Sequence, residues 1–180
     1  MKPISEMTNA ELAAFVQTHL RQNGIDVILS GGACVSIYTD NTYVSMDLDL
    51  VNVHFAKRTE IRNAMQEIGF EESGRHFSHP DTDFFVEFPE GPLAVGEEPV
   101  KEVQEHELTT GTLRLISPTD CIKDRLAGYY HWNDLQCLEQ AVMVAQATEI
   151  DLREIARWSD VEGMRDKFSS IRDRLTGKGT

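Results

Sequence analysis

The chain has 180 residues, of which 41% are hydrophobic and 26% charged, values that are ordinary for a globular protein with a core of its own, and its formal net charge of −13 makes it acidic. No run of apolar residues approaches the roughly 18 to 20 that a membrane-spanning helix needs. The N-terminal segment also lacks the apolar stretch of a secretory signal. We therefore expect a cytoplasmic protein without a membrane partner. Its acidity disfavours binding to duplex DNA.

The first predicted helix begins after Thr8 and stops at Gly24. Thr8 and Glu11 have the spacing of a capping box, in which each side chain caps the backbone of the other. Glycine is the residue that most often ends a helix. Between these limits apolar residues recur at helical intervals, at Leu12, Phe15, Val16 and Leu20.

Two glycines follow the next apolar run. Residues 26–30, with the sequence DVILS, predict a short buried strand, and a helix is expected directly after it. Glycine lets backbone N–H groups approach a ligand, and the N-terminus of a helix carries partial positive charge. Ser30, Gly31 and Gly32 are therefore candidates for phosphate binding, and Ser36 adds a hydroxyl one turn later. The alternative is a tight turn with no ligand.

Two aspartates interrupt the next predicted strand, residues 44–53. Asp47 and Asp49 lie on one face of it, about 6.5 to 7 Å apart along the backbone. Two ionised carboxylates at this spacing repel each other unless a cation lies between them. Mg²⁺, or Mn²⁺ in its place, fits because proteins bind Mg²⁺ through one or two carboxylates plus substrate phosphates. The alternative is a half-exposed strand with solvated acids.

A third acid comes from residues 81–93, which predict a strand ending in a Pro/Gly turn. Glu87 stands between Val86 and Phe88, which point to the opposite face, and Asp83 is a weaker competitor on the same face as Glu87. Three acids from two strands can hold two divalent ions about 4 Å apart, as in in-line nucleotidyl displacement. One acid can also accept the proton of the attacking hydroxyl.

The chain then changes character. Residues 94–107 predict an acidic loop, and residues 107–117 predict a hairpin that turns near Thr110 and Gly111. Ser117 follows as the N-cap of a helix, with proline and then an acid in the first turn.

From there the sequence predicts helices at about 118–131, 134–147, 151–158 and 161–175. We expect an α+β protein with a mixed β-sheet core flanked by helices. Its expected domains are an α/β core over residues 1–117 and a helical subdomain over residues 118–180 that packs on the core.

The order of these features resembles a known family. A strand, Gly-Gly, a helix, Asp-x-Asp on the next strand and a single acid on a later strand are typical of the nucleotidyltransferase fold with a DNA-polymerase-β-like core. The segments that carry the resemblance are SGGACVSIY, SMDLDL, FFVEFPEGPLAVG and LISPTDCIKDRLAGYYHWND. In this form the sequence resembles the bacterial abortive-infection and toxin branch and the nucleotidyltransferase-like proteins near it.

The resemblance implies transfer of a nucleotide from an NTP to a hydroxyl, with Mg²⁺ bound and pyrophosphate released. It also implies a role for each matching position. Gly31, Gly32 and Ser36 would bind the NTP phosphates, Asp47 and Asp49 would bind both metal ions, and Glu87 would bind the metal ion on the nucleophile side.

The sequence departs from the family pattern at Tyr43, where members of this branch often carry arginine. Lys123 and Arg125 can supply the missing positive charge, because lysine and arginine suit phosphate. In related toxins a lysine on the helix after SPTD faces the nucleotide, and Lys123 holds that position. The alternative for Lys123 is a solvated helix face.

The expected function is metal-dependent transfer of a nucleotide from an NTP to a hydroxyl acceptor, which can be RNA or protein. A toxin role with an antitoxin partner is implied by the resemblance alone. Two rivals stay open. One is an inactive module of the same fold that binds a nucleotide or a protein, and the other is a metal-dependent phosphohydrolase that uses water as acceptor.

Overall fold

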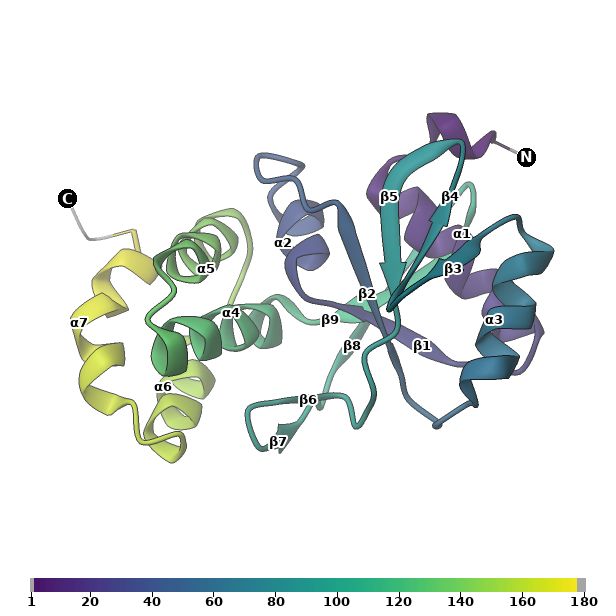
Figure 1. The fold of residues 1–180 in the computed structure, drawn as a ribbon. Helices are drawn as coiled ribbons and strands as arrows, with labels where there is room; N and C mark the ends of the chain where they lie inside the picture. The colour runs from purple at the N-terminus through teal and green to yellow at the C-terminus, as the bar shows by residue number, and fades with distance from the viewer. Residues whose placement is uncertain (1, 178–180) are drawn as a thin grey trace.

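The structure is a computed structural model that describes residues 2–177 (Figure 1). Its strands in chain order are β1 Val27–Ser30, β2 Asp47–Asn52, β3 Glu71–Ser73, β4 His76–His79, β5 Thr82–Glu87, β6 Ala94–Val95, β7 Glu98–Pro99, β8 Val103–Leu108 and β9 Gly111–Ile116. A short 3₁₀ turn, Ile4–Glu6, precedes the helices α1 Asn9–Gln22, α2 Gly32–Tyr38, α3 Arg58–Glu67, α4 Pro118–Trp132, α5 Leu135–Ala147, α6 Leu152–Val161 and α7 Arg165–Leu175.

Seven strands form one mixed sheet in the order β3-β4-β5-β2-β1-β9-β8. The β2–β5 and β1–β9 pairs are parallel, and the β1–β2, β3–β4, β4–β5 and β8–β9 pairs are antiparallel. The strands β6 and β7 make a separate hairpin. The expected α+β architecture with a mixed sheet is therefore confirmed.

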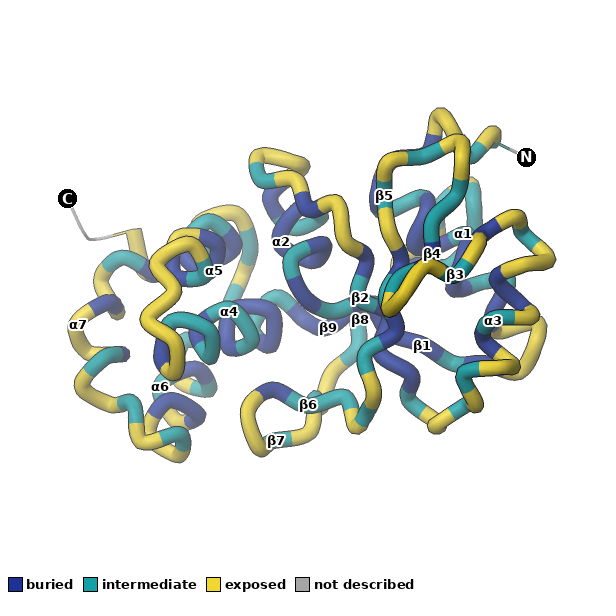
Figure 2. Tube along the Cα trace, viewed as in Figure 1, coloured by how far each residue is buried: buried dark blue, intermediate teal, exposed yellow. Residues whose placement is uncertain are grey.

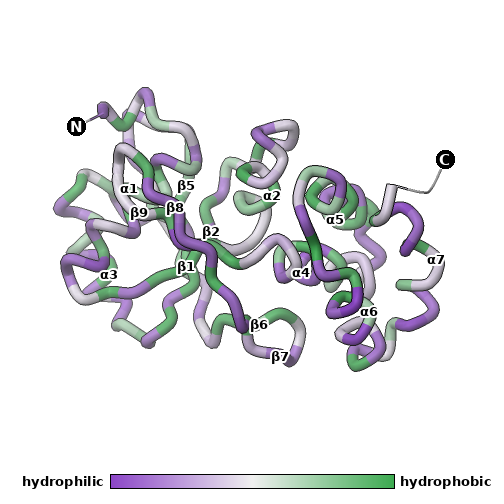
Figure 3. Tube along the Cα trace, turned by 180° about the vertical axis from the view of Figure 1, so that it is seen from behind, coloured by the Kyte–Doolittle hydropathy of each residue, from purple (hydrophilic) through white to green (hydrophobic). Residues whose placement is uncertain are grey.

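One face of the sheet carries the core. Leu29, Leu50 and Leu115 lie side by side on β1, β2 and β9, and all three side chains are fully buried. Arg58 of α3 stacks over the ring of Phe77 on β4, which places α3 on this same face. Figure 2 shows the buried centre of the sheet, and Figure 3 shows from behind that β8 is largely hydrophilic.

The local signals for helix ends are confirmed. Thr8 and Glu11 form the capping box of α1, with each side chain bonded to the backbone N–H of the other. Gly24 follows the end of α1 with a φ of +74°. The Ser117 hydroxyl accepts a hydrogen bond from the N–H of Asp120 at the start of α4.

Two segments differ from the sequence-based expectation. Residues 71–79 form the hairpin β3–β4, which the sequence pattern did not predict, because its strands span only three and four residues. Residues 103–107 were predicted as loop but belong to β8, whose alternating acids face solvent. Four of its six side chains are polar or charged, and only Val103 and Leu108 are apolar, so its apolar signal was too weak to recognise.

The four C-terminal helices lie on one side of the sheet domain, with α2 between them and the sheet (Figure 1). The β6–β7 hairpin reaches across to α6, where the indole N–H of Trp158 donates to the carbonyl of Val95. All strands precede residue 118, and the chain is helical from Pro118 onward as predicted. Within residues 2–177 no helix is long and apolar enough to cross a bilayer.

Candidate active site

Five side chains stand in one row across the sheet, on the face opposite the core leucines. In the strand register Ser30 pairs with Asp49, Asp49 with Glu87, Glu87 with His76, and His76 with Ser73. Paired residues on adjacent strands share a face and have backbones about 5 Å apart. The two predicted acids Asp49 and Glu87 are therefore direct neighbours.

Asp47 completes the acidic group on the same face, two residues before Asp49 along β2. Asp47 is exposed, whereas Asp49 and Glu87 are half-buried. We refer to Asp47, Asp49 and Glu87 as the acid set. The structure places Asp47, Asp49 and Glu87 on one face of two adjacent strands.

The glycine turn touches the acid set. Gly31 has a φ of +72°, a conformation that side chains disfavour. A Cβ atom added to Gly31 would collide with the carboxylate of Asp49 and stand 3.2 Å from its Cγ. A glycine is therefore needed here both for the turn and for the close approach of Asp49.

Burial and like charge act on Asp49 in the same direction. Burial raises its pKa to about 6, and the negative charges of Glu87 and Asp47 add to the rise. Arg125 of α4 lowers this pKa in part. The acid set is thus an electrostatically strained cluster that a bound cation would relieve.

Gly32, the first residue of α2, lies close to the side chains of Ser45 and Tyr43. A Cβ atom on Gly32 would stand 3.1 Å from the Ser45 hydroxyl and 3.6 Å from the Tyr43 hydroxyl. Ser36 is fully buried, and its hydroxyl accepts a hydrogen bond from the N–H of Ser45 at 2.8 Å. In this structure Ser36 fixes the loop before β2, and Tyr43 lies beside the glycine turn.

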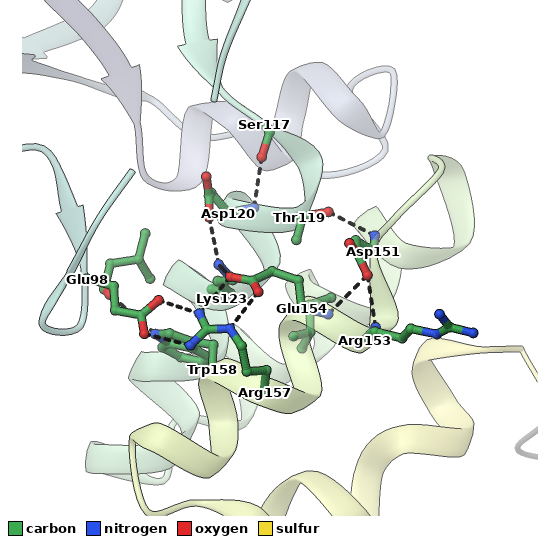
Figure 4. A network of polar contacts seen from close by, with 12 residues as sticks. Glu98, Ser117, Thr119, Asp120, Lys123, Asp151, Arg153, Glu154, Arg157 and Trp158 are labelled. Carbon is green, nitrogen blue, oxygen red and sulfur yellow. Dashed lines mark hydrogen bonds and ion pairs between the residues drawn. The ribbon is translucent and has the colours of Figure 1, made fainter. Parts of the chain in front are cut away.

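Lys123 is engaged elsewhere (Figure 4). Its ammonium is nearly buried and donates to Asp120 at 3.1 Å and to Glu154 at 2.7 Å. Hydrogen bonds from Arg157, which also pairs with Glu98, and from Lys123 lower the pKa of Glu154 to about 2. This network joins α4, α6 and the β6–β7 hairpin, so the structure does not bring Lys123 to the acid set.

Arg125 is the α4 cation whose charge reaches Asp49. An α-helix turns about 100° per residue, so Lys123 and Arg125 point in nearly opposite directions from α4. The Arg125 guanidinium donates to Asp124 and to Gln140 at 3.3 Å, and its side chain is largely buried. Sequence reasoning named Arg125 only as an alternative to Lys123.

The acid set suits a magnesium ion because its donors are carboxylate oxygens. The three side chains do not by themselves form a complete coordination shell. In the described part of the chain no three His, Cys, Asp or Glu side chains lie close enough together to hold a metal by themselves. Mg²⁺ takes carboxylate oxygens and usually completes its shell with water and substrate phosphates. The pKa of Asp49 is raised first by burial and then by the charges of Glu87 and Asp47, and a cation bound to these carboxylates would oppose that rise.

No family model and no curated protein matches the sequence. Solved structures do match the fold. An antigenic nucleotidyltransferase-like protein from Paracoccidioides brasiliensis aligns with a TM-score of 0.63 at 13% identity, over 94% of this chain and 93% of its own. The chain has a nucleotidyltransferase-like fold.

The antibiotic-resistance factor ANT(2″)-Ia shares this nucleotidyltransferase-like fold. Its complex with adenylyl-2″-tobramycin aligns with a TM-score of 0.52 at 15% identity, over 91% of this chain and 98% of that one. Its solution structure gives 0.50 at 16% identity, over 91% and 92%. These alignments run through both the sheet and the C-terminal helices, because they span more than nine tenths of the chain.

Sequence reasoning missed two side chains in the row, Ser73 and His76. His76 pairs with Glu87 across β4 and β5, and its ring lies 5.0 Å from that of Phe85. The available signal was Ser73-Gly74, a turn sequence between two short segments. Because the β3–β4 hairpin was not predicted, nothing placed His76 beside the acids.

Proposed function

We propose that this chain is a metal-dependent nucleotidyltransferase that moves a nucleotide from an NTP to a hydroxyl acceptor. The observation that carries the proposal is the acid set. Three carboxylates from two adjacent strands share one face, and one of them, Asp49, contacts the Gly31 turn, within a fold that nucleotidyltransferase-like proteins share.

In this proposal the uncharged residues of the glycine turn bind phosphates and the acid set binds the metal. Gly31 and Gly32 would offer backbone N–H groups to the NTP phosphates at the start of α2, with Ser30 at the end of β1. Asp47, Asp49 and Glu87 would hold Mg²⁺ or Mn²⁺. When bound, the metal neutralises charge on the reacting phosphate and on the leaving pyrophosphate.

Arg125 and Tyr43 are the groups we assign to the remaining phosphate contacts. Arg125 lies within electrostatic reach of Asp49, and a guanidinium binds phosphate well. The Tyr43 hydroxyl lies beside Gly32 and can donate a neutral hydrogen bond where arginine stands in the toxin branch. Lys123 and Ser36, predicted from the sequence for the same role, contribute instead through the contacts that hold α4 and the Tyr43 loop.

The acceptor needs a hydroxyl whose proton an acid can take. Glu87 is the member of the acid set farthest from the glycine turn, so we assign it the acceptor side. The solved complex of ANT(2″)-Ia contains adenylyl-2″-tobramycin. We extend the class of reaction to this chain, and not the acceptor. Cytoplasmic toxin activity with an antitoxin remains a proposal from the sequence resemblance.

The test is turnover of labelled NTPs with Mg²⁺. The purified chain should release pyrophosphate, or label an acceptor from a cell extract, in a metal-dependent reaction. Asp47→Ala and Glu87→Ala should each reduce the rate by at least about a hundredfold, since each removes charge stabilisation at the reacting phosphate. Asp83→Ala is the matched control, because Asp83 is an exposed acid on the same face of β5.

A nucleotide-binding module without turnover is the second candidate. The engagement of Lys123 by two carboxylates favours it, since one expected phosphate ligand is then occupied. NTP binding that requires Mg²⁺ and the acid set, with no transfer to any extract component, would support the binding module over the enzyme.

A further inference from the structure

A pocket of about 500 Å³ opens on the side of Glu87 away from the glycine turn. Its charged lining consists of Arg58 from the start of α3, Arg75 from the β3–β4 turn, and the acids Glu87 and Glu90. Glu87 is shared between this pocket and the acid set. The pocket therefore adjoins the proposed reaction centre.

The backbone of Arg75 lies in a tight turn, and its guanidinium has no partner among the described residues. Ser73 pairs with His76, so Gly74 and Arg75 form a two-residue turn, and the positive φ of +64° at Gly74 alone matches a type II′ turn. Arg75 is exposed, and its guanidinium has no hydrogen bond or ion pair with any residue among 2–177. A charged head on a rigid turn, facing a pocket, is available to a ligand.

Arg58 is held in place by three contacts. Its Nε donates to Glu72 at 2.7 Å, its Nη2 donates to the Arg75 carbonyl at 3.0 Å, and its guanidinium stacks 4.8 Å from the centre of the Phe77 ring. Glu72 also pairs with Arg62. One carboxylate thus serves two arginines, and the positive charge beside the pocket is not cancelled.

The charge balance of the pocket depends on the acid set. Two arginines and two glutamates line it, so it is neutral when both acids are ionised and free. A cation on Glu87 would cancel one negative charge and leave the lining net positive. Two arginines in one pocket stand out on a chain of net charge −13, and they are the groups that would bind an anionic ligand.

We propose that this pocket receives the acceptor through an anionic group, a phosphate or a carboxylate, bound by Arg75 with Arg58 beside it. The inference rests on the proposed function, because it treats Glu87 as the acceptor side of the reaction. Arginine forms paired hydrogen bonds to both kinds of anion. The acceptor hydroxyl then faces Glu87.

The geometry suits an in-line transfer. The acceptor oxygen forms a bond to the α-phosphorus of the NTP, the bond from that phosphorus to the bridging oxygen of the β-phosphate breaks, and pyrophosphate leaves with the electron pair. The hydroxyl proton passes to a carboxylate of the acid set. Glycine turn and pocket lie on opposite sides of the Asp49–Glu87 pair, as the entering and leaving groups require.

The test is a titration followed by NMR of backbone amides and arginine side chains, with Mg²⁺ and a non-hydrolysable NTP present. The probes are ribose 5-phosphate, ribose, gluconate and tobramycin, which separate phosphate, neutral, carboxylate and cationic acceptors. We expect ribose 5-phosphate or gluconate to shift the signals of Gly74, Arg75 and Glu87, more weakly as salt rises. Ribose and tobramycin should not shift them.

Variants locate the contact. Arg75→Ala should weaken binding of the anionic probe at least about tenfold, and Arg75→Lys should recover part of the loss because it keeps the charge. Arg172→Ala removes an exposed arginine of α7 that lies outside this pocket and should bind the probe as the parent does. Thermal unfolding of each variant confirms that the turn is intact.

The outcomes separate this inference from the function on which it rests. Equal binding of ribose, binding of tobramycin alone at these signals, or full binding by Arg75→Ala overturns the anionic pocket. The NTP signals report separately on the acid set and the glycine turn. If the NTP fails to bind while the anionic probe binds at Arg75, the proposed function falls and the anion site stands.

Discussion

At the scale of single residues, the close contact between Gly31 and Asp49 connects the glycine turn with the acid set. The glycine is required because a Cβ atom would occupy the space of the Asp49 carboxylate. The aspartate is half-buried among like charges, so it is poorly placed without a cation. Both residues therefore fit a role in ligand binding better than a role in stabilising the fold.

Gly31→Ala should damage NTP binding beyond its effect on stability. With φ of +72° and ψ of −155°, Gly31 lies in a region that is essentially restricted to glycine and costs alanine about 1 to 3 kcal/mol, and the new methyl group displaces the Asp49 carboxylate. We expect Mg²⁺-dependent NTP affinity to fall at least about tenfold. The measurement is equilibrium dialysis with labelled NTP beside urea unfolding.

Gly24→Ala is the matched control for that prediction. Gly24 has nearly the same φ, +74°, but a Cβ atom there meets nothing within 4 Å. It should lose about 1 kcal/mol of unfolding free energy and keep its NTP affinity. Equal loss of affinity in both variants would show that the contact between Gly31 and Asp49 is irrelevant to binding.

Asp49→Asn should stabilise the metal-free protein at pH 7 by about 1 kcal/mol and abolish Mg²⁺ binding. The folded pKa of Asp49, about 6, lies above the reference value of 3.8, so the folded state binds the proton more tightly. The unfavourable contribution is absent below about pH 3.8, grows between pH 4 and 6, and is complete above that range.

Urea unfolding at pH 7 and at pH 4 tests this prediction. The gain from Asp49→Asn should shrink at pH 4, where the parent carboxyl is protonated when folded. Mg²⁺ should raise the unfolding temperature of the parent and leave that of the variant unchanged. A gain of the same size at both pH values would exclude charge repulsion as its cause.

At the scale of elements, the β6–β7 hairpin fastens the sheet domain to α6. Trp158 is fully buried, stacks at 5.8 Å on Tyr130 and donates to the Val95 carbonyl. Arg157 pairs with Glu98 at the exposed rim of the same contact. Buried aromatic area contributes far more to stability than exposed ion pairs.

Trp158→Ala should therefore lower the free energy of unfolding by about 3 to 5 kcal/mol, and Arg157→Ala by no more than about 1 kcal/mol. The other tryptophan, Trp132, is 78% exposed and gives a matched control. Trp132→Ala should stay within about 0.5 kcal/mol of the parent. Urea unfolding measures all three, and a large effect of Arg157→Ala would contradict the assignment of the contact to burial.

Elements with a strong local pattern were predictable from the sequence. The capping box of α1 and the Ser117 cap depend on neighbouring residues, and both occur as expected. The short strands β3 and β4 have too few residues to show a period, so their hairpin was missed. Strand order is set by contacts far apart in the sequence, which is why His76 beside Glu87 could not be predicted.

In the candidate site too, features set by neighbouring residues were predictable and features set by distant contacts were not. Asp47 and Asp49 are two residues apart, so their shared face followed from strand geometry alone. Lys123 was chosen over Arg125 by resemblance, although the direction of each side chain depends on how α4 packs. Glu154 of α6 attracts Lys123, and no local pattern announces a partner 31 residues away.

At the scale of the whole molecule, the acid set, the glycine turn and Arg125 bring together the sheet domain and the C-terminal helices. Because α4 begins at Pro118, after the last strand of the sheet, the proposed function has α4 contribute to NTP binding from outside the sheet. In the proposed function, a bound metal ion would compensate the negative charge of this acidic chain where the phosphates bind. The central claim is therefore that metal and NTP bind together at the acid set.

The most direct measurement of that claim is equilibrium binding of labelled ATP, CTP, GTP and UTP with and without Mg²⁺, for the parent chain, Asp47→Ala and Glu87→Ala. We predict that at least one NTP binds only with Mg²⁺ and that both substitutions remove this binding while the variants stay folded. Absence of NTP binding, or metal-dependent binding that survives both substitutions, would contradict the account.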